Sequence, residues 1–213
     1  MAEITQFEQL MNGFGIVTVM NAHIYTIAEG NSYTSGCSAD GHTDLKVLGP
    51  DSWVDSGEVL DTLKIANITQ EGPTKTITGG QYANPLIKYG KTATMEMQDA
   101  LGRASTLSRF FGCDYNAEQG RLSVTDKFPG PFAIEGCTFF IDQKTGDKVW
   151  VYIFIPQFTP DAILTLTQDA EGDATVFDLN GSLGVTNIAD DAEGTNKREV
   201  FYEIRKSSFF KKD

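Results

Sequence analysis

The sequence has little positive charge. Its 213 residues include 17 lysines and arginines against 29 aspartates and glutamates, which gives a net charge of −12. Proteins that read nucleic acid or bind acidic membranes need a basic surface, because both of these partners are polyanions. The charge balance therefore argues against both classes and predicts a surface that repels phosphate.

Cysteine and long apolar runs are also scarce. The three cysteines cannot all pair within one chain, so the sequence predicts reduced thiols made in a cytoplasm and no disulfide scaffold. Residues 1–13 have no basic residue before their apolar positions, which predicts that there is no signal peptide. The longest apolar run, residues 149–155, is far shorter than the ~20 residues of a membrane-spanning helix, so we expect no membrane partner.

The residue groups of common catalytic and metal sites are missing as well. Cys37 lies near His42, but the further ligands of a zinc site are absent. There is no phosphate-binding loop, and Asn180 stands where a nucleophile elbow requires glycine. The acidic turn at 169–174 lacks the glycine spacing of a calcium-binding EF-hand, which favours a solvated hairpin tip. We therefore expect no enzymatic activity, metal or cofactor.

Glycine and alternating polar and apolar residues are abundant, and they predict antiparallel β-strands. Residues 59–69 predict a long strand, a turn at 71–73 is expected to reverse it, and residues 74–80 are expected to return as the second strand of a hairpin. Residues 148–156 are apolar on both faces, so this strand should be covered on both sides. Strands are also expected at residues 15–27, 92–97, 121–128, 132–142, 148–158, 162–167, 175–183 and 199–205.

One helix is predicted over residues 99–111. Asp99 is a suitable N-cap, Arg109 complements the helix dipole near the C-terminus, and Gly112 can adopt the left-handed conformation that ends a helix. The predicted fold is thus mainly β, an antiparallel β-sandwich or barrel with one packed helix, formed as a single domain by residues 1–213.

Residues 29–58 are unusual because they contain five glycines and few large apolar side chains. So long a segment without a regular pattern is uncommon in a compact domain and is often functional. One interpretation is an inter-subunit arm anchored by Trp53, since aromatic residues dominate interface energetics. The other is a plain surface excursion with one short strand at residues 45–48.

Residues 64–112 resemble the corresponding region of tail tube proteins, also called major tail proteins, of long-tailed bacteriophages. The shared features are a long hairpin with a Thr-Gly-Gly turn at 78–80, a loop with Asn-Pro at 84–85, and a strand with Glu96. The Asp-Ala-Leu sequence at 99–101 and the single helix follow in the same order.

The resemblance implies a structural virion protein that self-assembles into hexameric rings, which stack into the tail tube. Each subunit would contribute four strands to an inner β-barrel through which the genome passes. The implied partners are further copies of the chain, the tape measure protein, and tail-terminating or baseplate proteins. The implied location is the virion tail, assembled in the host's bacterial cytoplasm. DNA would pass without being bound, because a negative lumen repels phosphate.

Threonine-rich and acidic strand faces are the candidates for the lumen, since small uncharged side chains do not obstruct a channel. These candidates are Thr62, Thr74, Thr76, Thr78, Thr165, Thr167, Asp61, Glu71, Glu96 and Asp169. The alternative for each residue is an ordinary solvent-facing side of an antiparallel sheet.

Two other functions fit a β-rich chain. The first is a carbohydrate-binding or adhesive β-sandwich of a baseplate or cell surface, with Trp53, Trp150 and exposed tyrosines as a sugar platform. The second is a ring protein of a baseplate or secretion system built on the same tube fold.

Overall fold

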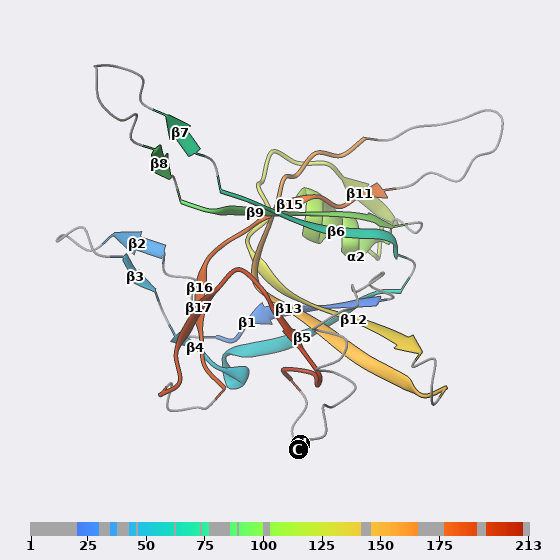
Figure 1. The fold of residues 1–213 in the computed structure, drawn as a ribbon. Helices are drawn as coiled ribbons and strands as arrows, with labels where there is room; N and C mark the ends of the chain where they lie inside the picture. The colour runs from blue at the N-terminus through green and yellow to red at the C-terminus, as the bar shows by residue number, and fades with distance from the viewer. Residues whose placement is uncertain are drawn as a thin grey trace.

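The computed structural model describes residues 21–29, 35–37, 43–45, 47–61, 63–72, 74–76, 86–88, 90–99, 103–141, 146–165, 177–190 and 195–210. Within these residues the chain is mainly β with one α-helix, which confirms the predicted fold class (Figure 1). No helix in the described part is long and apolar enough to cross a membrane.

The main sheet is antiparallel and curls into a half-barrel (Figure 1). Its order is β14-β9-β15-β13-β12-β1-β5, with β6 added beside β9 and β18 beside β13. The strands are β1 (Asn21–Ile27), β5 (Trp53–Leu60), β6 (Leu63–Glu71), β9 (Thr92–Asp99), β12 (Phe132–Ile141), β13 (Lys148–Pro160), β14 (Phe177–Asp178), β15 (Gly181–Leu183) and β18 (Glu203–Arg205).

Smaller sheets surround the half-barrel. Two-stranded ribbons are formed by β2 (Ser35–Cys37) with β3 (Thr43–Leu45), β7 (Thr74–Thr76) with β8 (Leu86–Lys88), and β10 (Asp114–Asn116) with β11 (Arg121–Ser123). A three-stranded sheet contains β4 (Val47–Leu48), β16 (Thr186–Ile188) and β17 (Arg198–Val200), and a 3-10 turn covers Pro50–Ser52. Figure 1 shows the β2–β3 and β7–β8 ribbons extending from the same side of the half-barrel.

Helix α2 (Ala104–Phe111) packs against the concave face of the half-barrel (Figure 1). Phe110 contacts Phe132 and Phe158 through ring-edge contacts with centroid separations of 5.1 and 5.7 Å. Met95 and Met97 of β9 belong to the same buried cluster. Burying a large apolar side chain stabilises a fold by about 1.5–3 kcal/mol, so this cluster holds the two halves of the sheet around the helix.

Strand β13 is covered on both sides at residues 153–156, which confirms part of the prediction for residues 148–156, whereas Lys148 and Trp150 at its start are exposed. Ile153 and Ile155 join the cluster around α2, whereas Phe154 joins a second cluster on the opposite face with Trp53. A bulge follows, because Ile134 pairs with Ile155 but Phe132 pairs with Phe158. The extra residue reverses the alternation, so Phe158 faces the helix and Thr159 is exposed on the far side.

The predicted helix start is wrong, although its end is confirmed. Asp99 is the last residue of β9 and is buried, and Arg103 is the N-cap of α2. Gly112 ends the helix in the left-handed conformation with φ 68°. Asp99 pairs with Leu63 and Phe177 on neighbouring strands, and this pairing extends the strand through the position that local sequence favours as a cap.

The predicted reversal at residues 71–73 is also wrong. Strand β6 pairs with β9 up to Glu71 and Thr92, and β7 pairs with β8 from Thr74 and Lys88. The four strands therefore form one long interrupted hairpin, whose two arms run along residues 63–76 and 86–99. Strand β7 therefore does not return along β6, and the predicted hairpin between residues 59–69 and 74–80 is not formed.

Several expected strands are shorter in the structure than in the sequence analysis. The strand expected at 121–128 is only β11, and the expected strands at 175–183 and 199–205 are each broken into two. Residues 161–165 lie outside any strand, in contrast to the strand predicted at 162–167. Ala162 has φ 56°, a left-handed conformation that a β-strand cannot continue through.

The segment 29–58 is not a single long loop. Residues 53–58 belong to β5 at the edge of the main sheet, and β4 pairs in parallel with β16. Leu48 is fully buried in the second cluster. Within the described residues, the part of this segment outside the main body is the β2–β3 ribbon.

Candidate functional site: a hydroxyl-rich sheet face

Four hydroxyl side chains form a row across the part of the sheet made by β6, β9, β15 and β13. Thr69 pairs with Thr94, Thr94 with Ser182, and Ser182 with Thr159. All four residues are exposed. The row lies on the face opposite α2, because the intervening residues Ala93 and Met95 are buried against the helix cluster.

The neighbouring positions on this face are polar or acidic. Asn67 pairs with Glu96 on one side of the row, and Glu71 pairs with Thr92 on the other. All of these side chains are exposed. We call the set Asn67, Thr69, Glu71, Thr92, Thr94, Glu96, Thr159 and Ser182 the hydroxyl face. It carries two carboxylates and no basic side chain.

The hydroxyl face contains two of the predicted lumen residues, Glu71 and Glu96. Asp61 lies elsewhere, at the connection between β5 and β6, where its carboxylate is 2.5 Å from the Arg103 guanidinium. Thr165 is exposed in the segment that follows β13. Thr74 and Thr76 belong to the β7–β8 ribbon. The remaining candidates, Thr62, Thr78, Thr167 and Asp169, lie outside the described residues.

The sequence analysis missed Thr69, Ser182 and Thr159 as members of one surface. The alternation of residues 92–97 places Thr92, Thr94 and Glu96 on one side of a strand, and this was the available signal. That these residues adjoin β15 and β13 depends on the pairing of β9 with β15, whose paired residues Thr94 and Ser182 are far apart in the sequence, and on the pairing of β15 with β13.

Trp53 lies in the core of its own chain. Its side chain is only 6% exposed and packs edge-on against Phe154 with ring centroids 6.2 Å apart. It starts β5 and helps to fill the cluster on the face opposite α2. The indole therefore packs within its own subunit, and the inter-subunit role stays a prediction.

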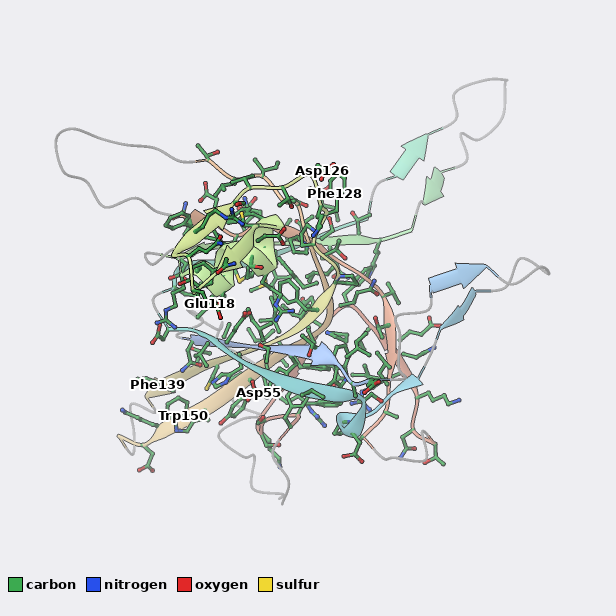
Figure 2. The ribbon with its side chains drawn as sticks, turned by 180° about the vertical axis from the view of Figure 1, so that it is seen from behind. Asp55, Glu118, Asp126, Phe128, Phe139 and Trp150 are labelled. Atoms are coloured by element: carbon green, nitrogen blue, oxygen red, sulfur yellow. The ribbon has the colours of Figure 1, made fainter. Side chains whose placement is uncertain are left out.

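Exposed aromatic side chains occur at other places. Trp150 is 44% exposed and contacts Phe139, with ring centroids 5.2 Å apart, on the β12–β13 hairpin. Phe128 is exposed in the segment between β11 and β12. Figure 2 shows Phe128 far from the Phe139 and Trp150 pair.

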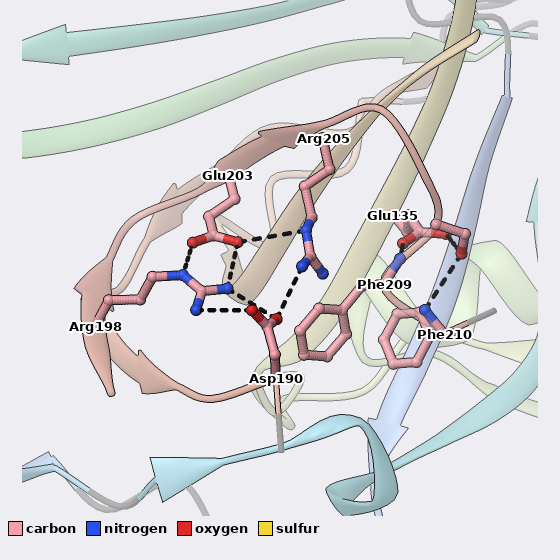
Figure 3. A network of polar contacts seen from close by, with 8 residues as sticks. Glu135, Asp190, Arg198, Glu203, Arg205, Phe209 and Phe210 are labelled. Atoms are coloured by element: carbon pink, nitrogen blue, oxygen red, sulfur yellow. Dashed lines mark hydrogen bonds and ion pairs between the residues drawn. The ribbon is translucent and has the colours of Figure 1, made fainter. Parts of the chain in front are cut away.

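The ionised groups near the C-terminus are engaged in a structural network (Figure 3). Arg198 donates hydrogen bonds to Glu203 and to both carboxylate oxygens of Asp190, and Arg205 bonds Asp190 at 2.8 Å. The hydrogen bonds from Arg198 lower the pKa of Asp190. Within the described residues, no group of three or more histidine, cysteine or carboxylate side chains could hold a metal ion.

The Cys113 and Cys137 thiols and the buried Glu135 carboxylate are not poised for chemistry. Burial raises the pKa of the Cys113 and Cys137 thiols, which keeps them protonated and weakly nucleophilic. Burial also raises the pKa of Glu135, and hydrogen bonds from Ser208 and the Phe209 amide oppose this shift. These hydrogen bonds hold the C-terminal segment in place, so Glu135 has a structural task.

Comparison with known proteins adds no relative: no protein-family model matches the chain, and no characterised protein matches it significantly. The chemistry of the hydroxyl face is therefore the basis for the function proposed below.

Proposed function

We propose that this protein is a structural subunit of a phage tail tube. Six copies close into a ring, rings stack into a tube, and the hydroxyl face lines the lumen. The genome passes through this lumen without being held. Assembly takes place in the cytoplasm of the host bacterium. The partners of the tube are the tape measure protein and tail-terminating or baseplate proteins.

The observation that carries the proposal is the composition of the hydroxyl face. Four adjacent strands present short hydroxyl and amide side chains with two carboxylates, and no described side chain of the face is basic. A basic channel would bind DNA by releasing counterions from phosphates. A neutral to acidic channel lacks this driving force, so DNA can slide through it.

The edges of the main sheet support assembly into closed rings. Strand β6 is nine residues long and, in the part of the chain that the structure describes, pairs only with β9. A long unpaired edge invites pairing with other chains. Closing the sheets of several subunits into a barrel removes this edge, because every strand then has two neighbours.

The projecting ribbons are suited to contacts between rings. The β2–β3 and β7–β8 ribbons extend beyond the half-barrel on one side (Figure 1). An isolated two-stranded ribbon is at best marginally stable in water, so contact with a neighbouring subunit would stabilise it. In this proposal the ribbons take the inter-subunit role that the sequence analysis gave to Trp53.

Electron microscopy tests the proposal. Purified protein, concentrated and imaged in negative stain, should show rings or tubes with an open channel. A sample that stays monomeric at all concentrations would contradict it. Rings that never stack would favour the baseplate or secretion-system ring instead.

A second candidate function is carbohydrate binding, and it is favoured only by the exposed Trp150. Its indole lies beside Phe139, and Lys148 lies 4.5 Å from the centre of the Phe139 ring. Trp53 cannot join such a platform because it is buried. A glycan screen with the native chain and Trp150→Ala separates this function from the tube, since binding should be lost in the variant.

A further inference from the structure

The chain after β18 lies on a groove of the same subunit without forming a strand. We call residues Lys206–Phe210 the C-terminal strap. It crosses the face of the sheet opposite α2, over β1, β12 and β13, and it pairs with no strand in the described part of the chain. What holds the strap must therefore come from side chains and individual hydrogen bonds.

Two phenylalanines of the strap fill aromatic sites. Phe209 is buried and stacks on Phe154 with ring centroids 4.3 Å apart and an interplanar angle of 7°. Phe210 stacks on Tyr25 at 3.6 Å and 15°. The Arg205 guanidinium lies 5.2 Å from the Phe209 ring centre. The two sites accept the consecutive aromatic residues of a segment that bends at residues 209–210.

One buried carboxylate accepts hydrogen bonds from the backbone and the serine of the strap (Figure 3). Glu135 is 5% exposed, and its two oxygens accept hydrogen bonds from the Ser208 hydroxyl and from the Phe209 amide, the latter at 2.7 Å. A buried carboxylate is costly unless donors surround it. The groove consequently prefers a segment that supplies a hydroxyl and an amide donor at this place.

Carboxylates line part of the surface beside the strap. A hollow beside the strap is lined by Asp51, Asp55 and Asp190 together with Arg205. In the sequence, the Ser-Ser-Phe-Phe segment has Lys206 before it and Lys211 and Lys212 after it. Asp190 is already paired with Arg198 and Arg205, so lysines that flank the segment would be attracted by Asp51 and Asp55, most strongly at low salt.

We propose that this groove is a binding site for a Ser-Phe-Phe segment flanked by lysines, and that the C-terminal strap is an exchangeable occupant. In the free subunit the strap fills its own groove, and the partner that replaces it is the strap of a second copy of this chain. The contacts are the same within one chain and between two, which makes exchange of an identical element a low-cost route to association.

A peptide-binding experiment on the full-length chain tests the site. In Phe209→Ser/Phe210→Ser the groove loses its own occupant. A labelled peptide of residues 206–213 should then bind, and binding to the native chain should be at least about tenfold weaker because the tethered strap competes at high effective concentration. The matched control is the same peptide with serine at both phenylalanine positions, which should not bind.

Further variants test the role of Glu135 and the partner. We call Phe209→Ser/Phe210→Ser the emptied chain. Adding Glu135→Gln to the emptied chain should weaken peptide binding about tenfold, since hydrogen bonds to a charged group are lost. A Glu135→Gln chain has a loosened strap and intact phenylalanines, so mixing it with the emptied chain should give a heterodimer in native mass spectrometry. Neither chain should dimerise alone. A folded mixture without heterodimer would overturn the exchange between copies.

A measurement on the native chain covers the case in which the double variant does not fold. Excess unlabelled peptide should displace the strap and speed hydrogen exchange at the Phe209 and Phe210 amides. Unchanged exchange, or equal binding of the control peptide, would overturn the proposed site. The peptide experiments use free subunits, so their outcome is independent of whether the chain forms tubes.

Discussion

At the residue scale, Gly112 shows how one position joins helix α2 to the following segment. Its φ is 68°, and a Cβ added there would lie 2.1 Å from the carbonyl oxygen of Lys127. The glycine therefore ends the helix and also permits the close approach of the Thr125–Pro129 segment, whose Thr125 hydroxyl bonds the Gly112 carbonyl at 2.6 Å.

Replacing Gly112 by alanine should strongly destabilise the fold. We expect the free energy of unfolding to fall by roughly 3 kcal/mol, because left-handed strain adds to the clash with Lys127. Gly120→Ala is the matched control, since Gly120 has φ 58° but nothing within 4 Å of the added Cβ. It should cost only about 1 kcal/mol. Equal losses in urea unfolding would show that the close approach is unimportant.

Asp190 should make the free energy of unfolding decrease at acidic pH. Its pKa is lowered in the folded state, mainly by hydrogen bonds from Arg198, so the carboxylate contributes stability above its unfolded pKa. This contribution is lost as the pH falls below the ordinary value of about 3.9. Asp190→Asn should therefore lose less stability than the native chain between pH 7 and pH 3 in urea unfolding. Asp126→Asn, on an exposed segment, is the charge-matched control. The prediction fails if Asp190→Asn loses as much stability as the native chain.

At the element scale, helix α2 supports the hydroxyl face from behind. Phe110 is almost fully buried between Phe132 and Phe158, and the same cluster contains the inward side chains of β9. Correct orientation of Thr94 and Glu96 thus depends on packing against the helix.

Phe110→Ala should reduce the free energy of unfolding by about 3–5 kcal/mol, because it leaves a cavity in this cluster. Ser105→Ala changes an exposed side chain of the same helix and should stay within about 0.5 kcal/mol of the native chain. Thermal and urea unfolding measure both. A small loss for Phe110→Ala would mean that the packing of this ring contributes little to the stability of the half-barrel.

At the scale of the whole molecule, the curled sheet separates two surfaces with different tasks. One half of the outer face is polar and forms the hydroxyl face, whereas the other half is covered by the second cluster and the strap. The bulge in β13 produces this division, because it changes which alternate residues face outward.

Adding positive charge to the hydroxyl face should turn the proposed conduit into a DNA-binding surface. Lysine at positions 69, 94, 159 and 182 should give assemblies that retain DNA at low salt, with affinity falling steeply as salt rises. The native assemblies should not retain DNA. Lysine at the exposed positions 117, 119, 122 and 124 is the matched control and should leave the channel unaffected. Equal DNA retention by both variants in filter binding would contradict the lumen assignment.

The sequence by itself determined features that depend on local pattern and composition. Alternation in residues 92–97 predicted the two faces of β9, and Gly112 predicted the helix end, because both reflect preferences of neighbouring residues. The double-sided burial of β13 followed from its apolar run. The low content of basic residues indicated the character of the surface before any strand was placed.

Tertiary structure decided what depends on pairing between distant segments. Asp99 became the end of a strand instead of a helix cap because Leu63 and Phe177 pair with it. Trp53 became part of the core because β5 joined the sheet. The row from Thr69 to Thr159 exists only because β6, β9, β15 and β13 align in register, and register is set by burial across the whole sheet, which no local pattern contains.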